Sequence, residues 1–323
     1  MSFWAWWTSR RDDVAAAIDG DGMPDELIDE LREHVAAIDP QLDWELAPGT
    51  DAEHALVVTS GGNPDLRATA ERWRRSAPPA DATWEYHAAR PPSYGDAAPV
   101  LDIDGQRIDL AELSASFAID DDREEVDVVV HHPRFAEIGE QTAGRVTFLA
   151  LDWMLGEEGV KRWIGAIDVA PLPPPAAGPL RTIVDAVHEL EHSTGEDRWL
   201  LLGGEDDEGV PIMVSAARPL KPVEHPLLDT HVSLTLAYEG REDGLPTPEE
   251  LDTLRAFEDD LEGELHDDAF FVAHASHAGE RTFHLYVDGE TDAADRLRRW
   301  ASDHGAAFDA ERDAAWDAVR AYR

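Results

Sequence analysis

One five-residue stretch of the chain has the residue types and spacing of a metal-dependent hydrolase. His188 and His192 flank Glu189 in the sequence His-Glu-Leu-Glu-His. In the H-E-x-x-H pattern, two histidines one helical turn apart bind zinc and the glutamate activates its water. The extended pattern would place a third ligand at Arg198, and a guanidinium cannot coordinate zinc. We therefore favour an ordinary surface helix and keep a zinc hydrolase, with Glu189 as its catalytic residue, as the alternative.

A second set of candidate residues recurs at alternate positions of the strands expected near the C-terminus. Strand alternation directs the apolar side chains of these strands toward the helices and leaves polar side chains on the opposite face. That face is polar but carries little charge, which favours a partner or ligand surface; the other interpretation is that it packs on the first domain or meets solvent. The residues expected on this binding surface are His231, Thr235, His274, His284 and Tyr286.

The whole chain is strongly acidic. Asp and Glu number 69 against 27 Lys and Arg, giving a formal net charge of -42 at pH 7, and the excess is spread along the sequence. A field of this sign repels phosphate backbones and anionic membranes, so we expect neither nucleic acid nor a membrane as a partner. A protein partner is compatible with this charge. The oligomeric state does not follow from the sequence.

Several chemistries are excluded by what the sequence lacks. Without cysteine there are no disulfides, thiolate nucleophiles or iron–sulfur clusters. No G-x-G-x-x-G, P-loop or G-x-S-x-G motif occurs, and no cofactor is expected outside the zinc alternative. Residues Met1–Arg11 lack the basic and apolar segments of a secretory signal. No apolar run approaches the ~20 residues of a membrane span, so a cytoplasmic location is the expectation.

A proline-rich stretch indicates where the chain divides. A prior of ~150 residues per domain predicts two domains for 323 residues. The stretch Ala170–Pro179 reads APLPPPAAGP, and proline both removes backbone donors and favours extended backbone. We therefore expect an N-terminal α+β domain over 1–169, a linker over 170–179 and a C-terminal domain over 180–323.

Each half is expected to be an α/β sandwich of the α+β class. In the first half, Asn63 and Pro64 supply an N-cap and a first-turn proline for a helix. The mixed order of elements favours an antiparallel α+β arrangement over a parallel doubly wound sheet. The expected helices are Phe3–Ile18, Pro24–Ile38, Pro64–Arg75 and Thr142–Leu155, and the expected strands are Leu42–Leu46, Ala55–Thr59, Thr83–Ala88, Ser114–Ile119, Val126–His131 and Trp163–Val169.

The second half predicts a helix over Leu180–His192 and then the order βββαββα. Thr247 and Glu250 form a capping box at the start of the main helix, which is expected to run to Leu265. This order predicts an expanded ferredoxin-like antiparallel sheet with its helices on one face. The expected strands are Arg198–Leu202, Val210–Ala216, His231–Tyr238, Ala269–His274 and Thr282–Val287, and the last helix is Asp292–Ser302.

Two stretches of the second half carry a resemblance to a known family. They are GLPTPEELDTLRAFEDDLEGEL at Gly244–Leu265 and FFVAHASHAGERTFHLYVD at Phe270–Asp288. Residues 199–303 resemble the bacterial family catalogued as domain of unknown function 695, in which an acidic helix precedes a hairpin of the form G-x-R-x-F-x-x-Y. The first half, with LDWMLGEEGVKRWIGAI at Leu151–Ile167, resembles the leading domain of other uncharacterised bacterial proteins. These resemblances imply a fold more than an activity.

The layout of the second half is also similar to that of the regulators of ribonuclease E activity, small acidic proteins that act by binding an enzyme. This similarity implies a binding role by analogy of fold alone. Our hypothesis from the sequence is a non-enzymatic cytoplasmic protein that engages another macromolecule, through the sheet face or through the acidic helix Thr247–Leu265. The zinc hydrolase using His188, Glu189 and His192 is its alternative.

Overall fold

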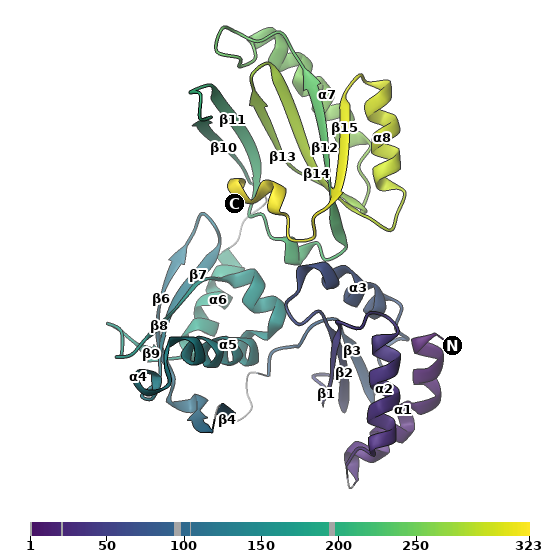
Figure 1. Ribbon diagram of the computed structural model, residues 1–323, viewed down its shortest axis with the longest axis vertical. Helices are drawn as coiled ribbons and strands as arrows, with labels where there is room; N and C mark the ends of the chain where they lie inside the picture. The colour runs from purple at the N-terminus through teal and green to yellow at the C-terminus, as the bar shows by residue number, and fades with distance from the viewer. Residues whose placement is uncertain (1, 21, 94–97, 104, 194–197) are drawn as a thin grey trace. The chain divides into compact units, whose positions relative to one another are not determined.

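The chain is described by a computed structural model, which covers residues 2–20, 22–93, 98–103, 105–193 and 198–323 (Figure 1). Helices and several sheets make up the structure, which confirms the predicted α+β class. Contacts divide the chain into two compact units. The first comprises Met1–Gly62 with Arg72–Gly195, and the second comprises Asn63–Glu71 with Glu196–Arg323. No helix in the described part of the chain is long and apolar enough to cross a membrane.

The first unit begins with two helices and a three-stranded sheet in the order β1-β2-β3, in which β2 is antiparallel to β1 and parallel to β3. The central strand β2 is buried along its whole length. Trp7 is fully buried and donates a hydrogen bond of 3.0 Å from Nε1 to the hydroxyl of Tyr86. The elements of this part of the chain are α1 (Phe3–Asp19), α2 (Asp25–Ala36), β1 (Asp43–Pro48), β2 (His54–Thr59), α3 (Pro64–Arg75), which belongs to the second unit as far as Glu71, and β3 (Trp84–His87).

The rest of this unit is a four-stranded sheet in the order β8-β7-β6-β9 with two long helices, together with the separate hairpin β4-β5. The long helix α5 is interrupted at Gly156, whose φ of 73° is not helical. A side chain there would meet the carbonyl oxygen of Arg90. The elements are β4 (Val100–Ile103), β5 (Gln106–Asp109), β6 (Ser114–Asp120), β7 (Glu125–His131), α4 (Phe135–Ile138), α5 (Glu140–Trp163), β8 (Ile164–Ala170), β9 (Gly178–Pro179) and α6 (Arg181–Ser193).

The helix α6 belongs to the first unit, whereas the sequence suggested that it opens the second domain. Its apolar residues Ile183, Val187 and Leu190 are buried in the same core as residues of α5, β6 and β7. An apolar stripe of this kind must be covered by another element, and here the preceding sheet and α5 cover it. The proline-rich stretch is therefore a connection inside the first unit, and the chain divides after α6.

The second unit is built on a six-stranded sheet in the order β10-β11-β13-β14-β12-β15, with every neighbouring pair antiparallel. The five strands expected from the sequence are present, and β15 adds an edge strand that was not predicted. The elements are β10 (Arg198–Glu205), β11 (Pro211–Arg218), β12 (Leu228–Ala237), α7 (Pro248–Gly263), β13 (Ala269–His277), β14 (Glu280–Asp288), α8 (Ala293–Asp303), β15 (Ala307–Arg312) and the short 3-10 helix η3 (Asp317–Tyr322).

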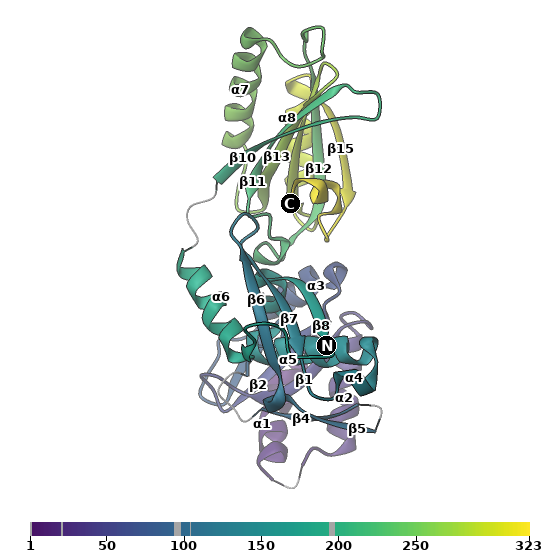
Figure 2. The ribbon, with the colours of Figure 1, turned by 90° about the vertical axis from the view of Figure 1, so that its left-hand side faces the viewer.

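Both long helices of this unit pack on one face of the sheet, as predicted (Figure 2). Leu261 of α7 and Trp300 of α8 share a core with Phe283 and Leu285 of β14. The start of α7 is capped as the sequence indicates, because the hydroxyl oxygen of Thr247 accepts a hydrogen bond of 3.2 Å from the Glu250 amide. The opposite face of the sheet is taken up by other parts of the same unit, described below.

Candidate ligand-binding site

The three residues of the zinc pattern lie on α6 with their side chains exposed. His188, Glu189 and His192 are all on the solvent side of the helix, and Nδ1 of His192 lies 2.6 Å from the carbonyl oxygen of His188. Among the residues that the structure describes, no group of three or more histidine, aspartate or glutamate side chains is arranged to hold a metal ion. His188 and His192 therefore have no third metal-binding side chain beside them among the described residues.

Four of the five residues predicted for the binding surface do share one face of the second unit's sheet. His231 is opposite Tyr286 in the pairing of β12 with β14. Nε2 of His231 lies 3.0 Å from Nδ1 of His284, and the hydroxyls of Thr235 and Thr282 lie 3.2 Å apart. Burial lowers the pKa of both histidines, that of His284 to about 4.

This face is covered by the segment that follows β15, so it is not the open surface that the sequence suggested. Tyr286 is 0% exposed, and its hydroxyl donates a hydrogen bond of 2.6 Å to Oδ2 of Asp313. The ring of Trp316 stacks on the ring of Tyr286 with centroids 4.2 Å apart, and Tyr322 lies against His284. Strand alternation predicts which side chains share a face, but not which segment covers that face.

The fifth predicted residue, His274, lies on the other face of the sheet. A β-bulge interrupts the pairing of β13 with β14 between Phe271 and Ala273. The extra residue leaves Val272 and Ala273 both on the face covered by Trp316. From the bulge onward, the alternation is therefore reversed relative to the prediction, and His274 faces α7, with Nδ1 3.0 Å from Oε2 of Glu258.

His274 opens into a cavity of about 410 Å³ between α7 and the sheet. Two rows of paired residues cross strands β10, β11, β13 and β14 beneath it. The first row runs Leu201, Ser215, His274, Phe283, and the second runs Gly203, Met213, Ser276, Arg281. Because paired residues on neighbouring strands point to the same side of a sheet, six of these side chains form one continuous floor, with Gly203 leaving a gap and Phe283 lying in the core under α7.

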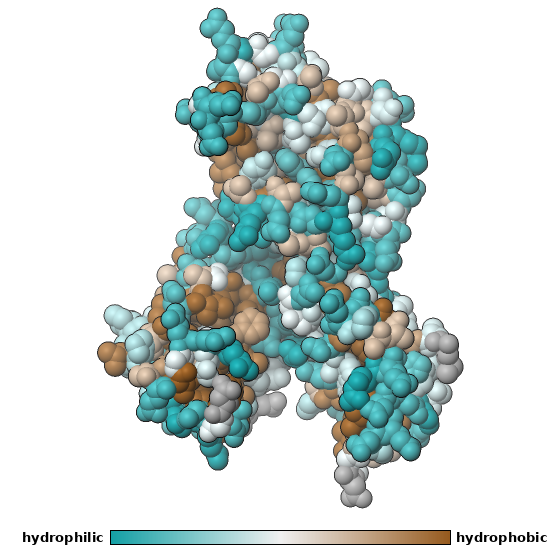
Figure 3. Space-filling view, viewed as in Figure 1, coloured by the Kyte–Doolittle hydropathy of each residue, from teal (hydrophilic) through white to brown (hydrophobic). Residues whose placement is uncertain are grey.

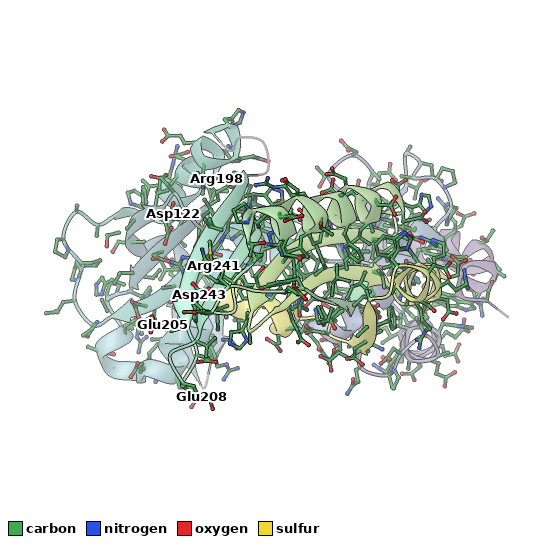
Figure 4. All side chains as sticks on the ribbon, turned by 90° about the horizontal axis from the view of Figure 1, so that it is seen from above. Asp122, Arg198, Glu205, Glu208, Arg241 and Asp243 are labelled. Atoms are coloured by element: carbon green, nitrogen blue, oxygen red, sulfur yellow. The ribbon has the colours of Figure 1, made fainter. Side chains whose placement is uncertain are left out.

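The roof of the cavity comes from α7 and from the loop that precedes it. Leu251, Arg255 and Glu258 line it from α7, and Arg241 and Leu245 line it from the loop. Figure 4 shows Arg241 beside Asp243, and the structure gives a distance of 2.7 Å between Nη2 of the arginine and Oδ2 of the aspartate. The α7 cavity, as we call this site, thus has a helix above and a strand surface below.

The most unusual side chain of the α7 cavity is that of Arg281. It is 5% exposed, and its Nε donates a hydrogen bond of 2.9 Å to the hydroxyl of Ser276. Among the described residues it forms no ion pair with a carboxylate, whereas Arg241 and Arg255 are each paired with an aspartate. Burial lowers the pKa of Arg281, and the neighbouring Glu258 opposes that effect. A guanidinium has five donors, so most of those on Arg281 are available to a ligand.

The α7 cavity is positively charged within an acidic protein. Its lining holds three arginines and one glutamate, and three positive charges less one negative charge leave a formal +2. The chain as a whole carries -42. Asp243 and Asp252 pair with Arg241 and Arg255, so the cation left to attract an anionic group at short range is Arg281.

The polar residues of the α7 cavity are not arranged for acyl transfer. Ser215, His274 and Glu258 have the residue types of a nucleophile, a base and an orienting carboxylate. In the described structure, however, no hydrogen bond joins Ser215 to His274, and the His274 ring is not oriented for a hydrogen bond to Glu258. Among the described residues, therefore, no base is bonded to the hydroxyl of Ser215.

In the sequence, Arg281 is only the arginine of the G-x-R-x-F-x-x-Y hairpin pattern. Its place in a cavity was not predicted. The signal was present in the strand itself, since Arg281 is two residues before Phe283 and four before Leu285, both expected to face the helices. Alternation alone therefore puts a cation on the apolar face of a central strand. Its significance could not be seen without knowing that a cavity lies between this side chain and α7.

A family model described as "Family of unknown function (DUF695)" matches residues 214–322. The match begins in β11 and ends in η3, so it includes Arg281 and the segment that covers Tyr286. It supports the resemblance found in the second half of the sequence. No curated protein matches the chain, and no solved structure matches it.

Proposed function

We propose that this protein is a non-enzymatic binding module whose second unit takes an anionic group into the α7 cavity. The observation that supports this most directly is Arg281, a buried guanidinium that lines the cavity and forms no ion pair with a carboxylate among the described residues. Burying a charge without a partner of opposite sign costs free energy. An anion bound against Arg281 would offset that cost through charge-assisted hydrogen bonds.

The binding role is the one expected from the sequence, but its site is the α7 cavity instead of the sheet face that carries His231 and Tyr286. The face that carries His231 and Tyr286 is occupied by Trp316, whereas the α7 cavity is open at the β10 end, where Leu201 is 69% exposed. The acidic helix of the sequence hypothesis is α7, and its inner side roofs the cavity. A regulatory function fits a module that binds a ligand without converting it.

Small anions provide the direct test. In the full chain at low ionic strength, acetate, sulfate and phosphate would be titrated into the wild type and each variant while the backbone amide resonances of residues 276 and 281 are followed by NMR. We expect saturable shifts in the wild type, weaker binding in Arg281→Lys because the planar fork is lost, and no binding in Arg281→Gln.

A matched control is Arg298→Gln, which removes a cation from the exposed side of α8, where the guanidinium lies over the ring of Phe308. This variant should bind as the wild type does. Binding that Arg281→Gln and Arg298→Gln reduce equally would show a general effect of charge, and it would refute the proposed site.

A further inference from the structure

We propose that the ligand of the α7 cavity is an amphipathic monocarboxylate, with its carboxylate head against Arg281 and an unbranched apolar chain that runs over Met213 to Leu201. This inference rests on the proposed function, because it needs an anionic group at Arg281. It adds the chemistry of the head, the presence of a tail and the path that the tail follows.

The head is assigned from the groups around Arg281. A guanidinium matches the two oxygens of a carboxylate with two parallel hydrogen bonds, and the hydroxyl of Ser276 lies beside it. Glu258 lines the same cavity with its side chain 20% exposed. A doubly charged phosphate would meet stronger repulsion from this glutamate than a single carboxylate would. The surroundings therefore favour a monoanion.

The tail is assigned from the opposite end of the cavity floor. Leu201 is 69% exposed and Met213 is 36% exposed, and both line the cavity. Trp199, two residues before Leu201 and on the same side of β10, is 42% exposed. On the side of the sheet away from α7, hydrophobic atoms also reach the surface at the β10–β11 end (Figure 3). Apolar side chains gathered at one end of a pocket indicate the apolar part of its ligand.

The distance between the two ends sets the length of the chain. Arg281 is on β14 and Leu201 is on β10, and β13 and β11 lie between them. Three strand spacings across the sheet and a two-residue offset along it make about 16 Å, which is the extended length of a carboxylate with roughly ten to twelve carbons. The cavity of about 410 Å³ is in the size range of small-molecule sites. Small residues, Ser215 and Ser276, form part of its floor, and Gly203 has no side chain.

Chain length and head group can be tested on the wild-type protein by calorimetry, below the concentrations at which these ligands form micelles. We expect affinity to rise from acetate through butyrate, hexanoate and octanoate to decanoate by up to about fourfold for each added CH₂ group. Octan-1-ol, which has the tail without the charge, should bind at least about tenfold more weakly than octanoate.

Two neighbouring glycines offer a matched pair of variants for the tail. Gly203 and Gly204 are consecutive residues of β10, and a Cβ built at either has no atom within 4 Å. Successive side chains of a strand point to opposite faces, so Gly203→Glu puts a carboxylate on the cavity floor and Gly204→Glu puts the same charge on the other side. We expect Gly203→Glu to weaken octanoate binding at least about tenfold and Gly204→Glu to change it less than twofold.

The possible results separate this inference from the proposed function. If acetate binds as tightly as octanoate and binding still depends on Arg281, the anion site stands and the tail assignment is overturned. If a short peptide with an apolar residue beside a glutamate binds at Arg281 and octanoate does not, the ligand is a peptide and the inference fails. If no anion binds in an Arg281-dependent way, both proposals fail.

Discussion

Nε2 of His231 and Nδ1 of His284 lie 3.0 Å apart on the sheet face that the Trp316 segment covers. One imidazole must donate and the other accept, so the accepting ring must be neutral. Burial lowers the pKa of His284 to about 4, and the nearby His231 lowers it further in the same direction. Burial thus opposes a charge on either ring, and the hydrogen bond itself is lost once both rings are protonated.

The first prediction concerns acid stability. As the pH falls from 6.5 toward about 4, His284 binds a proton in the unfolded chain but not in the folded one, so the free energy of unfolding falls. The loss attributable to this residue reaches about 3 kcal/mol. Urea unfolding across this range should show a steeper pH dependence of the free energy of unfolding in the wild type than in His284→Gln. The variant has the same carboxylates as the wild type and lacks only the imidazole. Parallel curves would show that the histidine pair does not contribute.

The second prediction concerns the segment that covers the sheet. Trp316 is fully buried, stacks on Tyr286, and donates a hydrogen bond of 2.9 Å from Nε1 to the carbonyl oxygen of Leu228. Truncation by Trp316→Ala should cost about 3–5 kcal/mol in the free energy of unfolding. Trp199→Ala, which removes a partly exposed indole of the same unit, should cost less than half as much. Equal losses would mean that the segment is only loosely attached.

The third prediction contrasts two arginines of the second unit. Arg281 forms no ion pair with a carboxylate among the described residues, whereas Arg296 pairs with both Asp268 and Asp292. Because removing an unpaired buried charge relieves a cost, Arg281→Met should keep or raise the urea midpoint. Arg296→Met breaks two partly exposed ion pairs and should lower stability by about 1 kcal/mol. A marked loss in Arg281→Met would show that the guanidinium serves the fold rather than a ligand.

Local patterns predicted most of the elements of the second unit. The strands follow from alternation of apolar residues, and the start of α7 follows from the Thr247 capping box, because both depend on residues close in the sequence. The strand β15 was missed, since Ala307–Arg312 contains three charged residues and only partly buried apolar ones. It is recognisable only once its pairing with β12 is known.

The candidate site was predicted less well because it depends on tertiary contacts. His231 and Tyr286 share a face as expected, but their cover comes from a short 3-10 helix with no sequence periodicity to reveal it. For the same reason, α6 was expected in the second domain. Its apolar stripe was identified from the sequence, but the sheet that covers the stripe was not. A stripe specifies that a face is buried, and it does not specify against which element.

The bulge at Val272 and Ala273 determines which alternate residues of β13 face the α7 cavity. Beyond it, His274 and Ser276 line the α7 cavity while Ala273 and Ala275 lie against the opposite core. Deleting Val272 would take up the surplus residue and leave this assignment unchanged. If the strand kept its length and lost the bulge, strict alternation would exchange the two sets, giving the cavity an alanine floor and pushing a histidine into the core around Trp316. The polar floor beside Arg281 thus depends on a single irregular pairing in β13.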